Sequence, residues 1–437
     1  MLSSRSRRGV AFGATAAAVS LVLAACSSSG SAGSGSGGDG DPVTLRVGWY
    51  GGEPVHAAME EALDQYEAEN PGVTVEVSRA AFADYFDRLA TETAGRSAPD
   101  VTRMSMSFFA DYAGRGSLLA LDDLVGETIQ MDALDPDVRE SGVLNGEYFG
   151  VPQSAISHAL VVNPELIESL GAETPSSEWT WDEFGDWSKQ LGQANPGFYG
   201  TSDMGNELQA FEVFVRQNGA ELFTDDGTAL GFDQAVLEEW WTYWQSMREE
   251  SGAPPAEVTA EGGGFESSAL TQGIAATTYA WVQQIVFFQE LNEDTLELQP
   301  MPRLDGGDPG QFLKALDFWS IASTSEHPQE AAELVNFLLN DPAAVESIGL
   351  TLGVPPSQAA RDTLDTDEST SEGEAVSYVE GLGEDRVGPP PGPWPRGYGE
   401  LMALFEKMGE DVAFGMTDVT GSATQFFQES ERVLGGY

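Results

Sequence analysis

Basic side chains are scarce in this sequence. Its 437 residues include 20 lysines and arginines against 71 acidic residues, which gives a net charge of −51 at neutral pH. A chain of this charge repels phosphate backbones and anionic headgroups, so neither nucleic acid nor an anionic lipid surface is expected as a partner. The acidic residues are spread evenly along the chain. We interpret them as a solvated surface, since no cluster suggests a site that attracts cations.

Cysteine and histidine are almost absent as well. Cys26 is the only cysteine, and the histidines are His56, His158 and His327. Disulfides and thiolate metal sites are thereby excluded. The sequence also lacks H-E-x-x-H, G-x-S-x-G and EF-hand patterns, so we expect no metal and no cofactor. A glycosidase needs only two suitably placed carboxylates, and counting acids does not exclude it.

Long apolar runs are missing too. The most apolar stretch, residues 10–23, is shorter and richer in alanine than the ~20 strongly apolar residues of a membrane-spanning helix. It follows Arg5, Arg7 and Arg8 and precedes small residues, which is the organisation of a secretory signal. We therefore predict that residues 1–25 are a signal peptide. Export by the Sec route and by the twin-arginine route both stay open.

The end of this signal explains the lone cysteine. The tetrapeptide Leu23-Ala24-Ala25-Cys26 resembles the lipobox of bacterial lipoproteins. The resemblance implies cleavage before Cys26, acylation with palmitate-like chains, and anchoring at the outer face of the cell membrane. Because one acyl chain binds a membrane only marginally, a diacylated cysteine is the expected anchor. Residues 26–41 continue as a Gly/Ser tract, which predicts a flexible linker.

The segment that follows alternates between strand and helix patterns. Residues 43–49 and 73–77 show apolar residues at every second position, and helical spacing follows each of them. A further strand begins near Val101. This β-α-β-α-β order predicts an α/β fold with a parallel, helix-covered sheet. Ligands of such sheets gather at the carboxyl ends of the strands.

Nine short motifs then occur in one order and carry a family resemblance. They are Asn70-Pro71-Gly72, Pro99-Asp100-Val101, Gly116 to Leu121, Asn145 to Pro152, Val162 to Glu165, Trp179 to Phe184, Asp226-Gly227 before Phe232-Asp233, Gly273 to Ala276 before Trp281, and His327 to Ala332. From Val43 to its end, the chain resembles the family-1 extracellular solute-binding proteins. These are sugar-binding receptors of bacterial ABC importers and distant relatives of maltose-binding protein.

The resemblance implies two α/β lobes with a ligand cleft between them, as in periplasmic binding proteins. The first lobe is expected to hold residues 42–125 and 311–356, and the second to hold 126–310 and 357–437. Hinge closure around a sugar or oligosaccharide would present the protein to a membrane permease. We expect a monomeric receptor and no enzyme. A receptor for another small solute, such as a peptide or polyamine, and a secreted glycosidase stay as alternatives.

A sugar site combines aromatic planes with hydroxyl-binding side chains. In the first lobe, strand ends and the loops after them supply the candidates Trp49, Tyr50, Glu53, Phe82, Met106 and Ser107. Trp49 could instead pack beneath its loop. The crossing near Gln153 and the later strand with Asp317 and Trp319 add further candidates. We expect only one of Asp317 and Trp319 to face the cleft.

The second lobe offers two tryptophans and two charged residues. Trp281 matches the family position where an aromatic ring lies against the sugar, with a core position as the alternative. Trp394 follows a proline-rich coil that matches another stacking position. Glu207 resembles a hydroxyl-binding carboxylate, although it could also cap a helix. Arg396 could donate to hydroxyls or pair with an acid.

Overall fold

The first sheet is organised around β1 (Val43–Tyr50). In this computed structural model, β1 lies parallel to β2 (Val73–Ala80) and to β3 (Val101–Ser105). Helices α1 (Glu53–Glu69) and α2 (Phe82–Ala94) connect these strands. The predicted β-α-β-α-β unit is therefore confirmed. The structure describes residues 42–262, 264–364, 366–383 and 385–435, so Cys26 and the linker lie outside the described residues.

Two later strands complete this sheet from the far side of β3. Strand β10 (Asp317–Ile321) runs antiparallel to β3 and also pairs with β6 (Val151–Pro152), which gives the order β2-β1-β3-β10-β6. The sequence-based boundary at residue 125 assigns residues 151–152 to the second lobe, whereas β6 lies in the first sheet. The short elements before it are α4 (Pro136–Glu140), β4 (Val143–Leu144) and β5 (Glu147–Tyr148).

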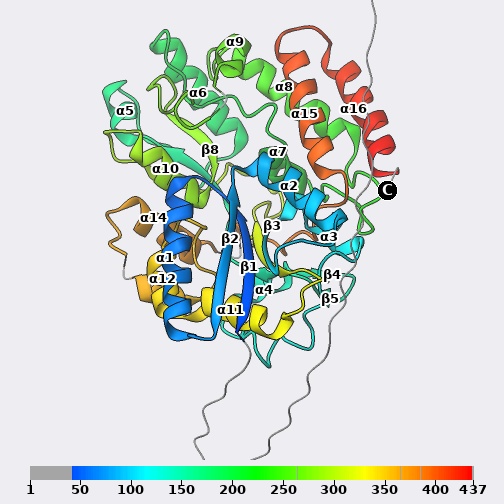
Figure 1. The fold of residues 1–437 in the computed structure, drawn as a ribbon. Helices are drawn as coiled ribbons and strands as arrows, with labels where there is room; N and C mark the ends of the chain where they lie inside the picture. Colours follow the sequence, from blue (N-terminus) through cyan, green and yellow to red (C-terminus); the bar gives the residue numbers. More distant parts are fainter. Residues whose placement is uncertain (1–41, 263, 365, 384, 436–437) are drawn as a thin grey trace, which may run out of the picture. The chain divides into compact units, whose positions relative to one another are not determined.

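Helices cover both faces of the first sheet (Figure 1). Apolar side chains of α1, α11 (Pro328–Asn340) and α12 (Pro342–Ile348) pack with the side chains of β1 that point to one face. The other face carries α2 and α3 (Met106–Gly114). Since successive side chains of a strand point to opposite faces, neighbours such as Trp49 and Tyr50 enter different cores.

The second sheet is small and antiparallel. Strand β7 (His158–Val162) lies between β8 (Thr277–Trp281) and β9 (Glu297–Gln299). Turns occupy residues 271–273, and β8 begins only at Thr277. The helices of this lobe are α5 (Pro164–Ser169), α6 (Trp181–Ala194), α7 (Leu208–Gln217), α8 (Gln234–Glu249), α9 (Ala256–Ala260), the 3-10 turn η1 (Val282–Gln284), α10 (Ile285–Glu290), α14 (Ser371–Gly381), α15 (Tyr398–Ala413) and α16 (Val419–Leu434).

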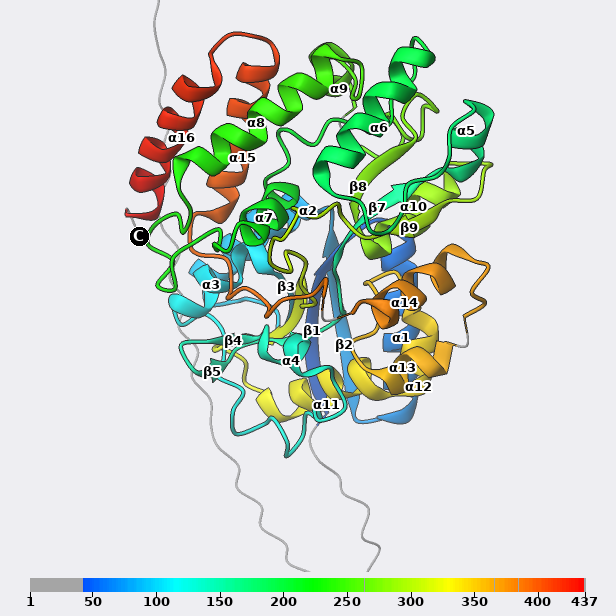
Figure 2. The same cartoon turned by 180° about the vertical axis from the view of Figure 1, so that it is seen from behind.

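Local sequence signals explain several of these helices. Thr180 and Glu183 form a capping box at the start of α6. Trp240, Trp241 and Trp244 of α8 are buried, and α8, α15 and α16 lie side by side (Figure 2). Helices α13 (Gln358–Leu364) and α14, which starts at Ser371, cover both ends of the acidic stretch 362–374. None of the described helices has the length and apolar content that crossing a bilayer needs.

The chain passes between the two sheets along three segments. Residues 153–157 lead from β6 to β7, residues 300–316 lead from β9 to β10, and residues 349–370 lead from α12 to α14. Isolated bridges join them, with Ile156 opposite Lys314 and Ala155 opposite Val354. The crossing segments therefore lie next to one another and divide the described part of the chain into a first lobe around β1 and a second lobe around β7.

Candidate functional site

A cavity of about 750 Å³ lies where the two lobes meet. Its first-lobe wall includes Ala110 and Gly114 of α3, and residues 143–145 flank it. Its second-lobe wall consists mainly of Glu212, the turn 221–228 and the coil 389–396. This volume lies within the roughly 300–1,000 Å³ of small-molecule sites, and a position between lobes is a common place for such sites.

The proline-rich coil brings two predicted residues to this cavity. Trp394 is 1% exposed and stacks on Tyr398, with ring centroids 4.0 Å apart and planes 8° apart. Arg396 Nε donates to Asp111 Oδ1 of α3 over 2.6 Å. Because Asp111 belongs to the first lobe, this ion pair is a direct contact between the lobes beside the cavity. Arg396 therefore pairs with an acid, which is one of the two roles that the sequence left open.

Buried charges lie behind the stacked rings. Glu212 of α7 is 1% exposed and lines the cavity, and its Oε2 has no hydrogen-bond partner. Burial raises the pKa of Glu212, while nearby Lys314 and Arg216 lower it. Burial also lowers the pKa of Lys314 to about 8. The Lys314 Nζ donates to no acceptor among the described residues and lies 4.6 Å from the Trp394 ring centroid.

Sequence reasoning missed Glu212, although a signal was present. It is an acid in the middle of Leu208-Gln209-Ala210-Phe211-Glu212-Val213-Phe214, a helix whose neighbouring positions are mostly buried. Acidic residues are almost never fully buried unless they are paired. A lone acid on the buried side of an apolar helix is therefore a candidate for a site residue.

Strand β8 ends beside this group of residues. Trp281 is 4% exposed, and its Nε1 donates to Gln209 Oε1 over 3.1 Å. Its ring centroid lies 4.4 Å from that of His158, which is fully buried. Burial lowers the pKa of His158 well below its usual value, with smaller contributions from nearby Lys314 and Arg216, so the imidazole is neutral.

Tyr279 is a second aromatic residue of β8 that the sequence reasoning missed. It is half-buried, whereas the residues on either side of it are buried. Burial raises its pKa, and the charges of Glu207 and Glu212 raise it further, which places all three in one neighbourhood. The alternation of β8 carries the signal, because Tyr279 shares a strand face with Trp281.

Glu207 immediately precedes α7 and is exposed. Its side chain makes no capping hydrogen bond, so helix capping does not explain it. The surrounding protein raises the pKa of Glu207 to about 7, and the charges of Glu406 and Asp203 add to the shift. A carboxylate that reaches solvent and is still desolvated by protein on several sides is typical of the wall of a cleft.

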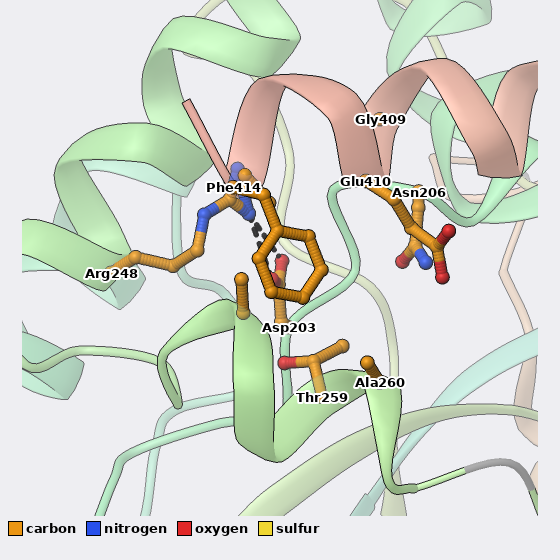
Figure 3. A pocket seen from close by; sticks show the side chains of 10 residues that line it. Asp203, Asn206, Arg248, Thr259, Ala260, Gly409, Glu410 and Phe414 are labelled. Carbon is orange, nitrogen blue, oxygen red and sulfur yellow. Dashed lines mark hydrogen bonds and ion pairs between the residues drawn. The ribbon is translucent and has the colours of Figure 1, made fainter. Parts of the chain in front are cut away.

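The loop that presents Glu207 is held by a buried ion pair. Arg248 Nη1 lies 2.7 and 2.9 Å from the two carboxylate oxygens of Asp203 (Figure 3). The indoles of Trp240 and Trp241 both donate to the carbonyl of Gly205. The recess around Asp203 has a volume of only about 10 Å³, which suits one water molecule rather than a ligand. The ion pair between Asp203 and Arg248 therefore fixes the loop that presents Glu207.

In the first lobe, aromatic rings gather at the carboxyl edge of the sheet. Phe82 is 45% exposed, and its ring meets the Tyr50 ring edge-on at 4.9 Å. Phe86 and Phe108 stack beside them, 4.2 Å apart. Met106 is buried and Ser107 is half-buried at the start of α3. Phe82 thus presents an apolar surface supported by buried rings.

Asp317 lies at the same edge but is already occupied. Its carboxylate takes a hydrogen bond from the Tyr50 hydroxyl and an ion pair with Arg103 Nη2, 2.7 Å away. All three residues are at least nine-tenths buried. Trp319 is 2% exposed and packs in the core with α11 and α12. The structure therefore places Asp317 nearer the strand ends and Trp319 inside the lobe.

Three other candidates lie apart from the cavity. Trp49 is fully buried, and its Nε1 donates to His56 Nδ1 over 3.1 Å. Glu53 is exposed and pairs with Arg79. Gln153 lines a recess of about 30 Å³ in the first lobe. In the described ranges, no group of three or more acidic, histidine or cysteine side chains is placed to hold a metal ion.

Comparisons with known proteins agree on one family. Residues 51–345 match the bacterial extracellular solute-binding proteins. An uncharacterized lipoprotein of Streptomyces antibioticus is 27% identical over 310 residues, which is 68% of this chain and 67% of that protein. The lactose-binding protein of Rhizobium radiobacter is 24% identical over 292 residues, 64% of this chain and 66% of its own. The chain thus spans about two thirds of these curated relatives.

A solved structure extends the agreement to the fold. The extracellular solute-binding protein family 1 from Alicyclobacillus acidocaldarius is 29% identical, with a TM-score of 0.72. The match covers 91% of this chain and all of that chain (100%). The two-lobed α/β architecture expected from the sequence is therefore confirmed.

Proposed function

Because this chain belongs to the family-1 bacterial extracellular solute-binding proteins, we propose that it is the sugar-capturing receptor of an ABC importer. It holds a sugar or oligosaccharide between its lobes and delivers it to a membrane permease. The family is one of binding proteins, and the proposed role involves no catalysed reaction and no cofactor. The receptor acts as a monomer.

The cavity between the lobes carries this proposal. A sugar needs a flat apolar partner for its C–H face and hydrogen-bonding partners for its hydroxyls. An indole and a carboxylate, those of Trp394 and Glu212, line the cavity. Tyr279 and Glu207 offer the same pair of chemistries nearby in the second lobe, and Phe82 offers an exposed ring in the first. The name of the lactose-binding relative supports a sugar as the ligand.

Ligand capture proceeds by a hinge motion at the three crossing segments. These segments pair through backbone bridges, so the lobes can rotate about a narrow, ordered strip. The Arg396–Asp111 ion pair joins the lobes on one side of the cavity. Closure therefore holds the sugar against both lobes, and the closed form is the one that the permease recognises.

The receptor stays at the outer face of the membrane through lipid on Cys26. The lipoprotein relative from Streptomyces antibioticus supports this part of the proposal. Replacing Cys26 by alanine should release the protein from the membrane fraction into the medium. The mass of the mature N-terminal peptide should show two acyl chains at Cys26, and an unmodified thiol would contradict the anchor.

Sugar binding can be tested on the full chain in detergent. Thermal unfolding and tryptophan fluorescence would be recorded against a panel of mono- and oligosaccharides that includes lactose. A bound sugar at 100 times its Kd adds about 2.7 kcal/mol to the stability, which gives a readily measured rise in Tm. Turnover of a glycoside, with no shift from any sugar, would overturn the proposal.

A matched pair of variants locates the binding. Trp394→Phe replaces an indole of the cavity wall by a smaller ring, so the sugar-dependent rise in Tm should shrink. Trp187→Phe changes a half-buried indole of α6 that donates to the carbonyl of Glu173. Trp187 is not among the residues that line the cavity, so this variant should keep the full response.

A further inference from the structure

The wall of the cavity between the lobes is rich in acids and poor in bases. The residues that line its volume of about 750 Å³ include one base, Arg396, and the acids Glu212, Glu221, Asp225 and Asp226. Arg396 is already paired with Asp111 of α3. A negatively charged ligand would therefore meet carboxylates in this cavity, and the base that lines it is already engaged.

The two glutamates are balanced by cations behind the wall. Glu221 forms an ion pair with Arg216, whose side chain is 3% exposed. Burial raises the pKa of Glu212, while the nearby Lys314 and Arg216 favour its ionised form. Because these opposite charges lie close to one another inside the protein, their fields largely cancel in the cavity.

Asp225 and Asp226 have no such balance. Both are exposed, and neither belongs to an ion pair of the described residues. The hydroxyls of Thr224 and Thr228 donate to Asp226 Oδ1 over 2.7 and 2.8 Å. These hydrogen bonds lower the pKa of Asp226, so its carboxylate is ionised at neutral pH.

The turn that carries both aspartates is fixed against the coil 389–396. Gly227 has a φ of +65°, in the left-handed region that favours glycine. A Cβ atom at this position would lie only 2.9 Å from Pro395 Cβ. The ring of Phe223, before the turn, contacts that of Tyr398, with centroids 6.1 Å apart. The two carboxylates are therefore presented to the cavity by a backbone that is held on both sides.

The cavity is large enough for a bound sugar to come near this turn. Even at the ~30 Å³ that one water molecule takes up in the liquid, the non-hydrogen atoms of a hexose, about twelve, fill about 360 Å³. This is an upper bound, because covalently bonded atoms lie closer together. One ring thus fills less than half of the 750 Å³, and a sugar of two or more rings comes within reach of the turn.

We propose that the cavity accepts uncharged sugars and rejects sugars that carry carboxylates, and that Asp225 and Asp226 are the residues that reject them. Like charges brought together at a binding site oppose association. A neutral sugar avoids this penalty, because its hydroxyls can donate to the same carboxylates. The inference rests on the proposed sugar-binding function and names the chemical class of sugar to which it applies.

The test compares a neutral sugar with its own uronate, in which a carboxylate replaces a hydroxymethyl group. The full chain in detergent would be titrated calorimetrically with the panel disaccharide of highest affinity and with its uronate, at low and at high salt. At low salt the uronate should bind about fivefold to tenfold more weakly, as like charges about 4 Å apart in water imply. High salt should shrink this deficit, because exposed charges are screened, and should leave the neutral sugar unaffected.

Variants assign the effect to the turn. Asp225→Asn with Asp226→Asn removes two charges and keeps an oxygen that can accept the hydrogen bonds of the turn, so the uronate should bind nearly as tightly as the neutral sugar. Glu61→Gln with Asp64→Asn removes the same charge from exposed positions of α1, which packs on the other face of the first sheet from α3. This control should keep the full deficit. Asp225→Asn alone leaves the bonds of Asp226 intact and should recover part of the affinity, should the double variant fail to fold.

The outcomes separate the inference from the function on which it rests. A uronate that binds the wild type as tightly as the neutral sugar, or more tightly, would overturn the inference and leave sugar binding standing. Equal recovery in both double variants would mean that net charge rejects the uronate, and the assignment to Asp225 and Asp226 would be overturned. Binding of no panel sugar by the wild type would overturn the proposed function and the inference together. A deficit that disappears only with the two aspartates supports both.

Discussion

Replacing Asp317 by alanine removes the acceptor that two buried donors share at the carboxyl edge of the first sheet. The Tyr50 hydroxyl and Arg103 Nη2 both reach its carboxylate, from β1 and β3. Burial raises the pKa of Tyr50 well above its usual value, with the Asp317 charge as the next cause, so the phenol keeps its proton. In the alanine variant, a buried guanidinium and a buried hydroxyl would lose their partner at once.

The structure sets the expected cost. The side chains of Arg103 and Asp317 are each only 7% exposed, and breaking such a buried pair costs about 3–5 kcal/mol. An exposed pair gives the comparison. Arg303 and Glu178 lie 2.8 Å apart with side chains 41% and 58% exposed. Replacing Arg303 by glutamine should therefore cost no more than about 1 kcal/mol, and it leaves Glu178 paired with Arg386.

Urea unfolding followed by tryptophan fluorescence measures both changes. Asp317→Ala should lower the free energy of unfolding by several times the loss in Arg303→Gln. The double variant Asp317→Leu with Arg103→Met should recover most of that loss, because apolar side chains can replace a buried pair at little cost. If Asp317→Ala lost less than about 1 kcal/mol, the pair would not hold the strand ends together and the reasoning would be refuted.

Three further outcomes follow from the site. Trp281→Ala should lower stability by about 3–5 kcal/mol and also weaken sugar binding, because Trp281 is buried and donates to Gln209; an unchanged Tm would contradict its burial. The pKa of Glu207 is raised from 4.5 to about 7, so its contribution to stability is full below pH 4.5 and is lost as the pH rises through 7. The Tm of Glu207→Gln, relative to that of the wild type, should therefore rise as the pH increases from 4.5 to about 7. A difference in Tm that does not change with pH would refute the raised pKa. Asp111→Asn removes the carboxylate paired with Arg396, which should weaken sugar affinity by less than about tenfold, and the effect should fade at high salt; equal effects in titrations at low and high salt would exclude an electrostatic contact.

Local sequence patterns predicted where helices and strands lie better than they predicted which of them pair. The capping box of Thr180 and Glu183 lies within four consecutive residues, so the start of α6 could be read directly. The direction of β10 could not be predicted from local residues, because its antiparallel pairing with β3 depends on a chain that returns from the second lobe. Thr370 accepts a hydrogen bond from the Gly373 amide at the start of α14, although the acidic residues around it are typical of an exposed loop.

The site shows the same division between local and long-range information. The alternation of β1 predicts that Trp49 and Tyr50 face opposite ways, but only the packing of α1 decides that Trp49 enters the core. Trp394 could be placed at the cavity from the family resemblance alone. Glu212 could not, because its unpaired oxygen becomes visible only when Lys314 and the coil 389–396 are packed around it.

The crossing segment that contains Lys314 contacts residues that lie far apart in the chain. The backbone of Lys314 exchanges two hydrogen bonds with Ile156, and its Nζ lies over the Trp394 ring. Asp317, which pairs with Arg103, follows Lys314 by three residues. The amide protons of Lys314 and Ile156 can exchange with solvent only when this bridge opens. Their exchange rates therefore form a built-in reporter of how tightly the lobes are joined, and one that needs neither a dye nor an engineered label.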